Sequence, residues 1–139
     1  MAPEYAKELV WEERYNTLKN QVYVLGKQMH RILRLNNKVD FVITDSPLLL
    51  SMIYRPEWLG VTFDNTVLHC FNSFYNIIFF LKRNKPYKNV GRIQTEDEAK
   101  KLDREIESKL KENHIKYEKI IGTSDGVNLA FNIIENNHW

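Results

Sequence analysis

The sequence predicts an α/β fold in which a parallel sheet of about three strands is flanked by helices. Short runs of β-branched and aromatic residues at 41–44, 76–81 and 117–121 have the length and composition of buried strands. Segments with helical spacing of apolar residues separate these runs, and strands that alternate with helices favour a parallel sheet. The 139 residues can bury one core and contain no Gly/Ser linker, so a single domain over residues 1–139 is expected.

The first half of the chain is expected to begin with a long helix over about residues 6–35. Its apolar positions recur at helical spacing, and Gly26 marks a position where a kink is expected. The first strand ends at Asp45, and Pro47 then fits the first turn of a helical stretch over 48–54. A loop follows, and a further helix is expected over about residues 64–73.

The second half is expected to hold the other two strands and two helices. A basic loop follows the second strand, and Thr95 with Glu98 has the pattern of a capping box for a helix that ends near Asn113. The third strand comes next, and Asp125 is expected to cap a last helix over about residues 127–135.

Composition and charge limit the function classes. The net charge of +2 is too small a bias to indicate a nucleic-acid partner, and Cys70 alone cannot form a disulfide within the chain. No run of about 18 apolar residues occurs, so no membrane span is expected. The first residues are charged where a signal peptide would be apolar, which favours the cytoplasm.

Three stretches carry a resemblance to a known family. They are EYAK at 4–7 with QVYVLGKQMHR at 21–31, VITDSPLLL at 42–50, and VGRIQTEDEA at 90–99. In this order they resemble a family of phage and bacterial P-loop ATPases related to nucleoside and nucleotide kinases, of which the ribosylnicotinamide kinase domain is a relative. The resemblance implies a three-layer parallel sheet of P-loop-kinase type and, for a phage protein, a location in the host cell cytoplasm.

The chain departs from this family at its phosphate-binding loop, the Walker A motif. No G-x-x-x-x-G-K followed by Ser or Thr occurs, and the single Gly-Lys pair, Gly26-Lys27, lies inside a helical pattern. The resemblance therefore implies a kinase-type fold truncated at its N-terminus, without the loop that holds the phosphates and magnesium. Loss of the central strand would leave a slot in the sheet, which a homo-oligomer or a partner protein would fill.

The resemblance also assigns site residues, each with a simpler alternative. Asp45 would organise magnesium or the acceptor hydroxyl if the protein is active; its alternative is a helix N-cap. Phosphate contacts would come from basic and amide side chains around a lid, and the alternative is a solvated loop and charged helix. These side chains are Arg83, Arg92, Gln94 and Arg104. The acceptor side would be formed by Glu4, Gln28 and Arg31, whose alternative is an ordinary polar helix face.

Three functions follow from these observations. We expect a non-catalytic kinase-like protein, encoded by a phage, that binds a partner protein or a nucleotide in host takeover or counter-defence. The isolated chain would then need no cofactor. The alternative is a nucleoside or nucleotide kinase or ATPase whose P-loop is supplied elsewhere and which uses ATP and magnesium. Nucleic-acid binding through the basic stretch 82–88 is the weakest hypothesis.

Overall fold

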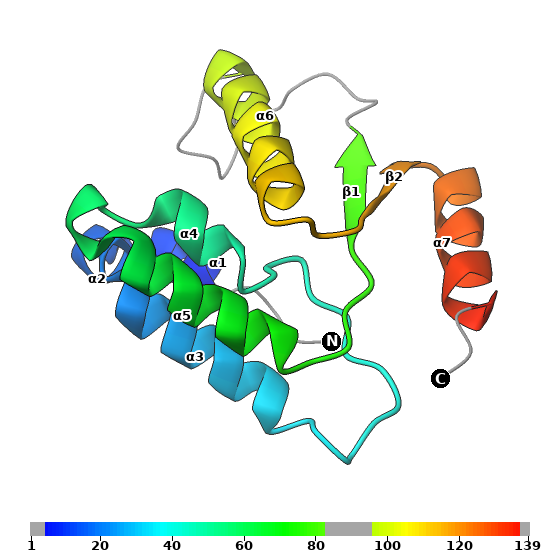
Figure 1. Cartoon of the computed structure of the whole chain (residues 1–139), viewed down its shortest axis with the longest axis horizontal. Coiled ribbons are helices and arrows are strands. Elements are labelled where there is room, and N and C mark those ends of the chain that lie inside the picture. Colours follow the sequence, from blue (N-terminus) through cyan, green and yellow to red (C-terminus); the bar gives the residue numbers. More distant parts are fainter. Residues whose placement is uncertain (1–4, 83–95, 137–139) are drawn as a thin grey trace. The chain divides into compact units, whose positions relative to one another are not determined.

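The computed structural model describes residues 5–82 and 96–136, and Figure 1 labels its helices and strands. The chain divides into two compact units, Met1–Tyr75 and Asn76–Trp139, and each is described by itself. The expectation of a single domain stays a prediction.

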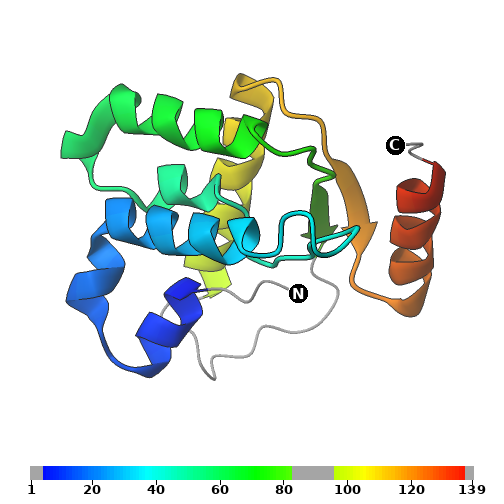
Figure 2. The same cartoon turned by 90° about the horizontal axis from the view of Figure 1, so that it is seen from below.

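Helices are the regular structure that the described residues of the N-terminal unit form. Its elements are α1 (Tyr5–Trp11), α2 (Tyr15–Lys19), α3 (Gln21–Leu33), α4 (Leu50–Tyr54), the 3-10 turn η1 (Glu57–Leu59) and α5 (Gly60–Asn72). Short α4 packs against both α3 and α5, and Figure 2 shows it between these two longer helices. The expected helix over 48–54 is therefore confirmed from residue 50, and the helix expected over 64–73 begins earlier, at Gly60.

The long helix expected over residues 6–35 is three helices in the structure. The chain turns back after α1 through Glu13, whose φ of 55° lies in the left-handed region. This turn lets α1 fold onto α3, where Tyr5, Leu9 and Val24 form a buried apolar cluster. Asn20 then starts α3 by accepting a hydrogen bond from the backbone N–H of Tyr23 at 3.2 Å. The helix continues through Gly26 without a break.

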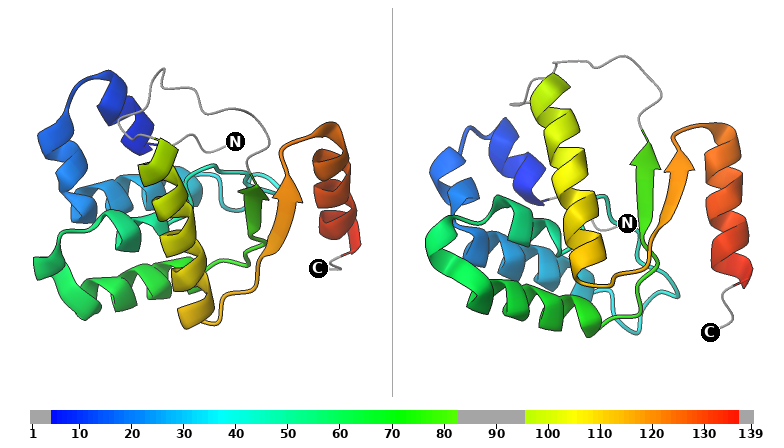
Figure 3. Two further views of the ribbon diagram at one scale, coloured as in Figure 1. Left: turned by 90° about the horizontal axis from the view of Figure 1, so that it is seen from above. Right: turned by 45° about the horizontal axis from the view of Figure 1, so that its top comes forward.

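The C-terminal unit holds two strands and two helices. They are β1 (Phe79–Lys82), α6 (Glu96–Glu112), β2 (Glu118–Ile121) and α7 (Ser124–Asn136). The strands are parallel, with Phe79 opposite Glu118 and Lys82 opposite Ile121, and α7 packs beside β2 as Figure 3 shows. The strands expected at 76–81 and 117–121 and both helices of this half are thus confirmed, with shifted ends. Thr95 of the capping box lies outside the described residues.

The start of α7 differs from the expectation in its capping residue. The helix begins at Ser124, and the Thr123 hydroxyl accepts a hydrogen bond from the backbone N–H of Gly126 at 3.3 Å. The Thr123 carbonyl accepts the next one, from Val127, at 3.0 Å. Thr123, rather than Asp125, therefore caps this helix.

The predicted fold class is wrong. The described residues form helices and a single two-stranded sheet, rather than a three-layer parallel sheet of P-loop-kinase type. The missing strand is the one expected at 41–44, where the backbone has no regular structure and Ile43 is 65% exposed. A parallel strand needs neighbours and cover on both faces. Because this segment lacks both among the described residues, its β-branched composition is not sufficient to make it a strand.

Candidate functional site

A polar cluster joins α1 to α3 in the N-terminal unit. Its members are Tyr5 and Glu8 on α1 and Tyr23, Gln28 and Arg31 on α3, and we call it the Tyr5 cluster. These side chains meet because the turn after α1 brings two helical faces together over Leu9 and Val24.

Gln28 is the buried centre of this cluster. Its side-chain oxygen accepts a hydrogen bond from the backbone N–H of Tyr5 at 3.2 Å, and its amide nitrogen donates to Thr44 Oγ1 at 3.2 Å. Thr44 Oγ1 also accepts from the backbone N–H of Ser46 at 3.1 Å. Gln28 therefore connects α1, α3 and the irregular segment after α3, and its polar atoms are engaged within the protein.

Arg31 lies one turn further along α3 and contacts two side chains of α1. Its guanidinium donates to Glu8 at 2.5 Å and lies over the Tyr5 ring, 4.9 Å from the centroid. The hydrogen bond from Arg31 lowers the pKa of Glu8 below its ordinary value. Both contacts hold the start of α1 against α3.

The two tyrosines of the cluster are joined through their phenol groups. The Tyr5 hydroxyl donates to the Tyr23 hydroxyl at 3.4 Å, and the rings meet edge to face with centroids 5.9 Å apart. The hydrogen bond with Tyr23, helped by burial, raises the pKa of Tyr5. The same hydrogen bond lowers the pKa of Tyr23, and nearby Lys27 lowers it further.

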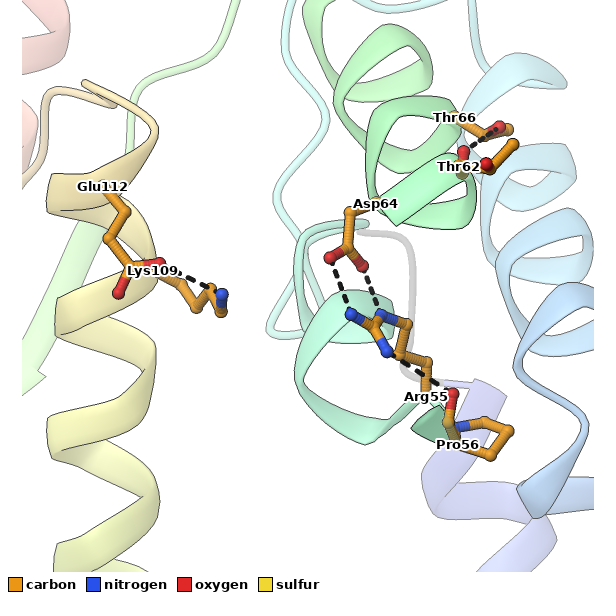
Figure 4. A network of polar contacts seen from close by, with 7 residues as sticks. All are labelled: Arg55, Pro56, Thr62, Asp64, Thr66, Lys109 and Glu112. Carbon is orange, nitrogen blue, oxygen red and sulfur yellow. Dashed lines mark hydrogen bonds and ion pairs between the residues drawn. The ribbon is translucent and has the colours of Figure 1, made fainter. Parts of the chain in front are cut away.

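A second feature of this unit is an exposed apolar corner between α4 and α5. Tyr54, Trp58 and Val61 are exposed there, and Trp58 is 80% exposed. Arg55 donates two hydrogen bonds to Asp64, from Nε to Oδ1 at 2.5 Å and from an Nη atom to Oδ2 at 2.8 Å, and Figure 4 shows this bidentate pair. We call these five residues the Trp58 corner. Its ion pair is partly buried, so it fixes the two ends of the corner more firmly than a fully exposed pair would.

In the C-terminal unit, the Glu107 carboxylate contacts three donor side chains. Glu107 Oε1 accepts from Lys119 at 2.7 Å and from Tyr117 at 2.9 Å, and it lies 2.9 Å from Lys111 Nζ. These contacts, with Lys119 first, lower the pKa of Glu107 to about 2. The contacts of Glu107 with Tyr117 and Lys119 connect α6 to β2 and to the residue before it. The neighbouring pair Lys109–Glu112 in Figure 4 is an exposed contact within α6.

The residues proposed from the sequence do not form one site that the structure describes. Gln28 and Arg31 do come together, in the Tyr5 cluster. Asp45 is exposed in a bend five residues before α4, and Arg104 is exposed on α6 in the other unit. Four calls, Glu4, Arg83, Arg92 and Gln94, lie outside the described residues. The roles proposed for all eight residues are untested.

Two further observations concern the described residues. No group of three or more His, Cys, Asp or Glu side chains there is arranged to hold a metal ion. No helix among them is both long enough and apolar enough to cross a membrane.

Comparison with known protein families identifies a family for this chain. The family model described as Spore wall protein 9 matches residues 2–133, which is nearly the whole chain. The chain belongs to the Spore wall protein 9 family. Nothing matches it among curated proteins or among solved structures.

This membership corrects the interpretation drawn from the sequence. The Spore wall protein 9 family is microsporidian, so the resemblance to a phage and bacterial P-loop ATPase family is wrong. The functions built on it, a non-catalytic kinase-like phage protein or a kinase completed by a separate P-loop, are wrong as well. The family name also contradicts the cytoplasmic location. The error arose from short stretches, and the strand expected at 41–44, which overlaps one of them, is irregular in the structure.

Sequence reasoning missed the two features that stand out in the N-terminal unit. The Tyr5–Tyr23 pair depends on the turn at Glu13, which carries no glycine or proline to reveal it. The Trp58 corner had a weak signal, an arginine and an aspartate nine residues apart around a segment with Pro56 and Gly60.

Proposed function

We propose that this chain is a structural component of a spore wall, and that it acts by binding other macromolecules of the wall rather than by catalysis. The observation that carries the proposal is the match of the Spore wall protein 9 family over residues 2–133. The family is named after the spore wall. In the wall the chain would be a structural element that acts without a cofactor.

The Trp58 corner supports the binding part of this proposal. Exposed tryptophan is enriched among the residues that dominate protein–protein binding energy, because it buries a large area with few rotatable bonds. Trp58 is held on a short segment that the Arg55–Asp64 pair closes. We therefore propose a protein of the wall, or a second copy of this chain, as the partner that covers this corner.

Immunogold labelling of thin spore sections tests the location. Label concentrated over the wall supports the proposal, whereas label spread through the cell interior contradicts it.

Retention on isolated spore walls that keep their proteins tests the surface. We expect Trp58→Ser to weaken retention by about tenfold or more, as for a binding hot spot. Trp11→Ser is the matched control, because Trp11 is also an exposed tryptophan of this unit but lies at the end of α1, outside the corner. Equal retention of the two variants would show that the corner is not the binding surface.

A further inference from the structure

The Tyr5–Tyr23 pair places two phenols in contact across two helices. Their oxygens are 3.4 Å apart and their ring centroids 5.9 Å apart, although the residues are 18 positions apart in the chain. Tyr5 packs with Leu9 and Val24 in the apolar cluster between the two helices. The contact is therefore a fixed feature of the N-terminal unit rather than a chance meeting of mobile side chains.

The two phenols differ in how far solvent reaches them. Tyr23 is 39% exposed, whereas Tyr5 is 9% exposed and lies under the Arg31 guanidinium. A soluble oxidant can thus reach Tyr23 directly. Tyr5 is reached through its hydrogen bond, because its hydroxyl is the donor to Tyr23.

From this geometry we propose that Tyr5 and Tyr23 are a modification site, where a peroxidase with hydrogen peroxide joins the two rings into an intramolecular dityrosine. The inference goes beyond the proposed function and does not depend on it, since the reaction needs only this chain, a peroxidase and hydrogen peroxide.

The reaction takes place in balanced one-electron steps. The first oxidation removes one electron and one proton from the Tyr23 hydroxyl and leaves a phenoxyl radical. Tyr5 then passes its phenolic hydrogen atom along the hydrogen bond to Tyr23, so the radical moves to Tyr5. The second oxidation removes an electron and a proton from Tyr23 again. The two radicals form one carbon–carbon bond between ring positions next to the oxygens, and the hydrogens on those carbons move to the oxygens. Hydrogen peroxide takes up the two electrons and two protons and becomes two molecules of water.

The arrangement of the rings suits this bond. The coupling carbons flank the carbon that bears each oxygen, so contact between the two oxygens brings the coupling edges together. The lowered pKa of Tyr23 also favours loss of its proton during oxidation.

Peptide mapping tests the inference on the full chain. The purified protein is oxidised at low concentration with horseradish peroxidase and hydrogen peroxide, and is then cleaved with trypsin. The peptides 1–7 and 20–27 each contain one tyrosine, Tyr5 and Tyr23 respectively. We expect a linked pair of these peptides whose mass is two hydrogens below their sum. Tyr5→Phe and Tyr23→Phe should abolish it, and Tyr15→Phe, an exposed tyrosine of the same unit, should leave it unchanged.

An isotope experiment on the unmodified sequence excludes coupling between chains. Equal amounts of ¹⁵N-labelled and unlabelled protein are mixed before oxidation. An intramolecular bond gives linked peptides that are wholly labelled or wholly unlabelled. Linked peptides with one labelled partner, or dityrosine that never involves peptides 1–7 and 20–27, would overturn the proposal, and this readout does not depend on whether any variant folds.

Discussion

Replacing Gly126 by alanine tests the packing of α7 on β2, because two physical effects give opposite signs. Gly126 is buried near the start of α7. Alanine forms helices better than glycine by about 1 kcal/mol, so local propensity alone predicts a more stable protein. The tertiary structure predicts the reverse.

The magnitude follows from the space around Gly126. A Cβ atom there would lie 1.9 Å from the carbonyl oxygen of Ile121 and 3.0 Å from its carbonyl carbon. The helix or the strand must then move by more than about 1 Å to restore van der Waals separation. The same oxygen accepts a hydrogen bond from the backbone N–H of Thr123 at 2.7 Å, so movement also disturbs the turn. Overpacking costs about 1–3 kcal/mol, and a clash with backbone at 1.9 Å belongs in the upper part of that range. After the propensity gain of about 1 kcal/mol is subtracted, we expect a net loss of about 1–2 kcal/mol for Gly126→Ala.

Urea unfolding of the full chain, followed by circular dichroism, measures this loss, and hydrogen exchange locates it. Amides of β2 and α7 should exchange faster in Gly126→Ala, because these elements lose their close contact. Val127→Ala is the control: Val127 is the next residue of the same helix and is exposed, so its change should stay within about 0.5 kcal/mol. If Gly126→Ala proved as stable as the original protein, the close approach of α7 to Ile121 would be wrong.

Three other perturbations have defined outcomes in the same unfolding assay. Gly60 has φ 57° and ψ −165°, a conformation that is nearly exclusive to glycine, so Gly60→Ala should lose about 1–3 kcal/mol; an unchanged midpoint would contradict this backbone geometry. Leu9 is fully buried, so Leu9→Ala should lose about 2–5 kcal/mol, while exposed Val22→Ala should change little, and equal losses would refute the assigned core. The lowered pKa of Glu107 means that its contacts stabilise the fold above its ordinary pKa of 4.5 and are lost as pH falls toward about 2. Glu107→Gln should therefore make stability less dependent on pH in that range, and an unchanged pH profile would exclude Glu107 as its source.

The sequence was most informative where local pattern and tertiary environment agree. The two strands at Phe79–Lys82 and Glu118–Ile121 and the helices Glu96–Glu112 and Ser124–Asn136 were expected close to their observed positions. In this half, apolar runs alternate with a strongly amphipathic helix, so periodicity and packing favour the same structure.

The spacing of apolar residues predicted the wrong structure where contacts between residues far apart in the sequence determine the fold. Residues 6–35 have helical spacing throughout, yet the chain turns at Glu13 because folding α1 onto α3 buries Tyr5 and Leu9. Ile43 belongs to a β-branched run, yet that run has no strand beside it among the described residues. The free energy gained by burying these side chains exceeds the local preference for helix or strand. Burial of this kind leaves no local signal in the sequence.

The candidate sites were harder still to predict than the fold. Gln28 and Arg31 were expected to share a helix face, but their partners Tyr5 and Glu8 are 23 residues away in sequence. Spacing along one helix could place two residues on a shared face. It could not show that a second helix covers that face, so the contacts of these side chains with α1 were not predicted.

The closed form of the Trp58 corner affects how a partner would bind there. Because Arg55 and Asp64 already join its two ends, and Gly60 fixes the entry to α5, the backbone that carries Trp58 has little freedom left to lose. Association with a flexible loop must first order that loop, at a cost of about 1–2 kcal/mol per residue. A corner that is ordered in advance avoids most of this penalty, so more of the energy of burying the indole ring remains as affinity. Preorganisation of this kind allows a small surface to make a lasting contact.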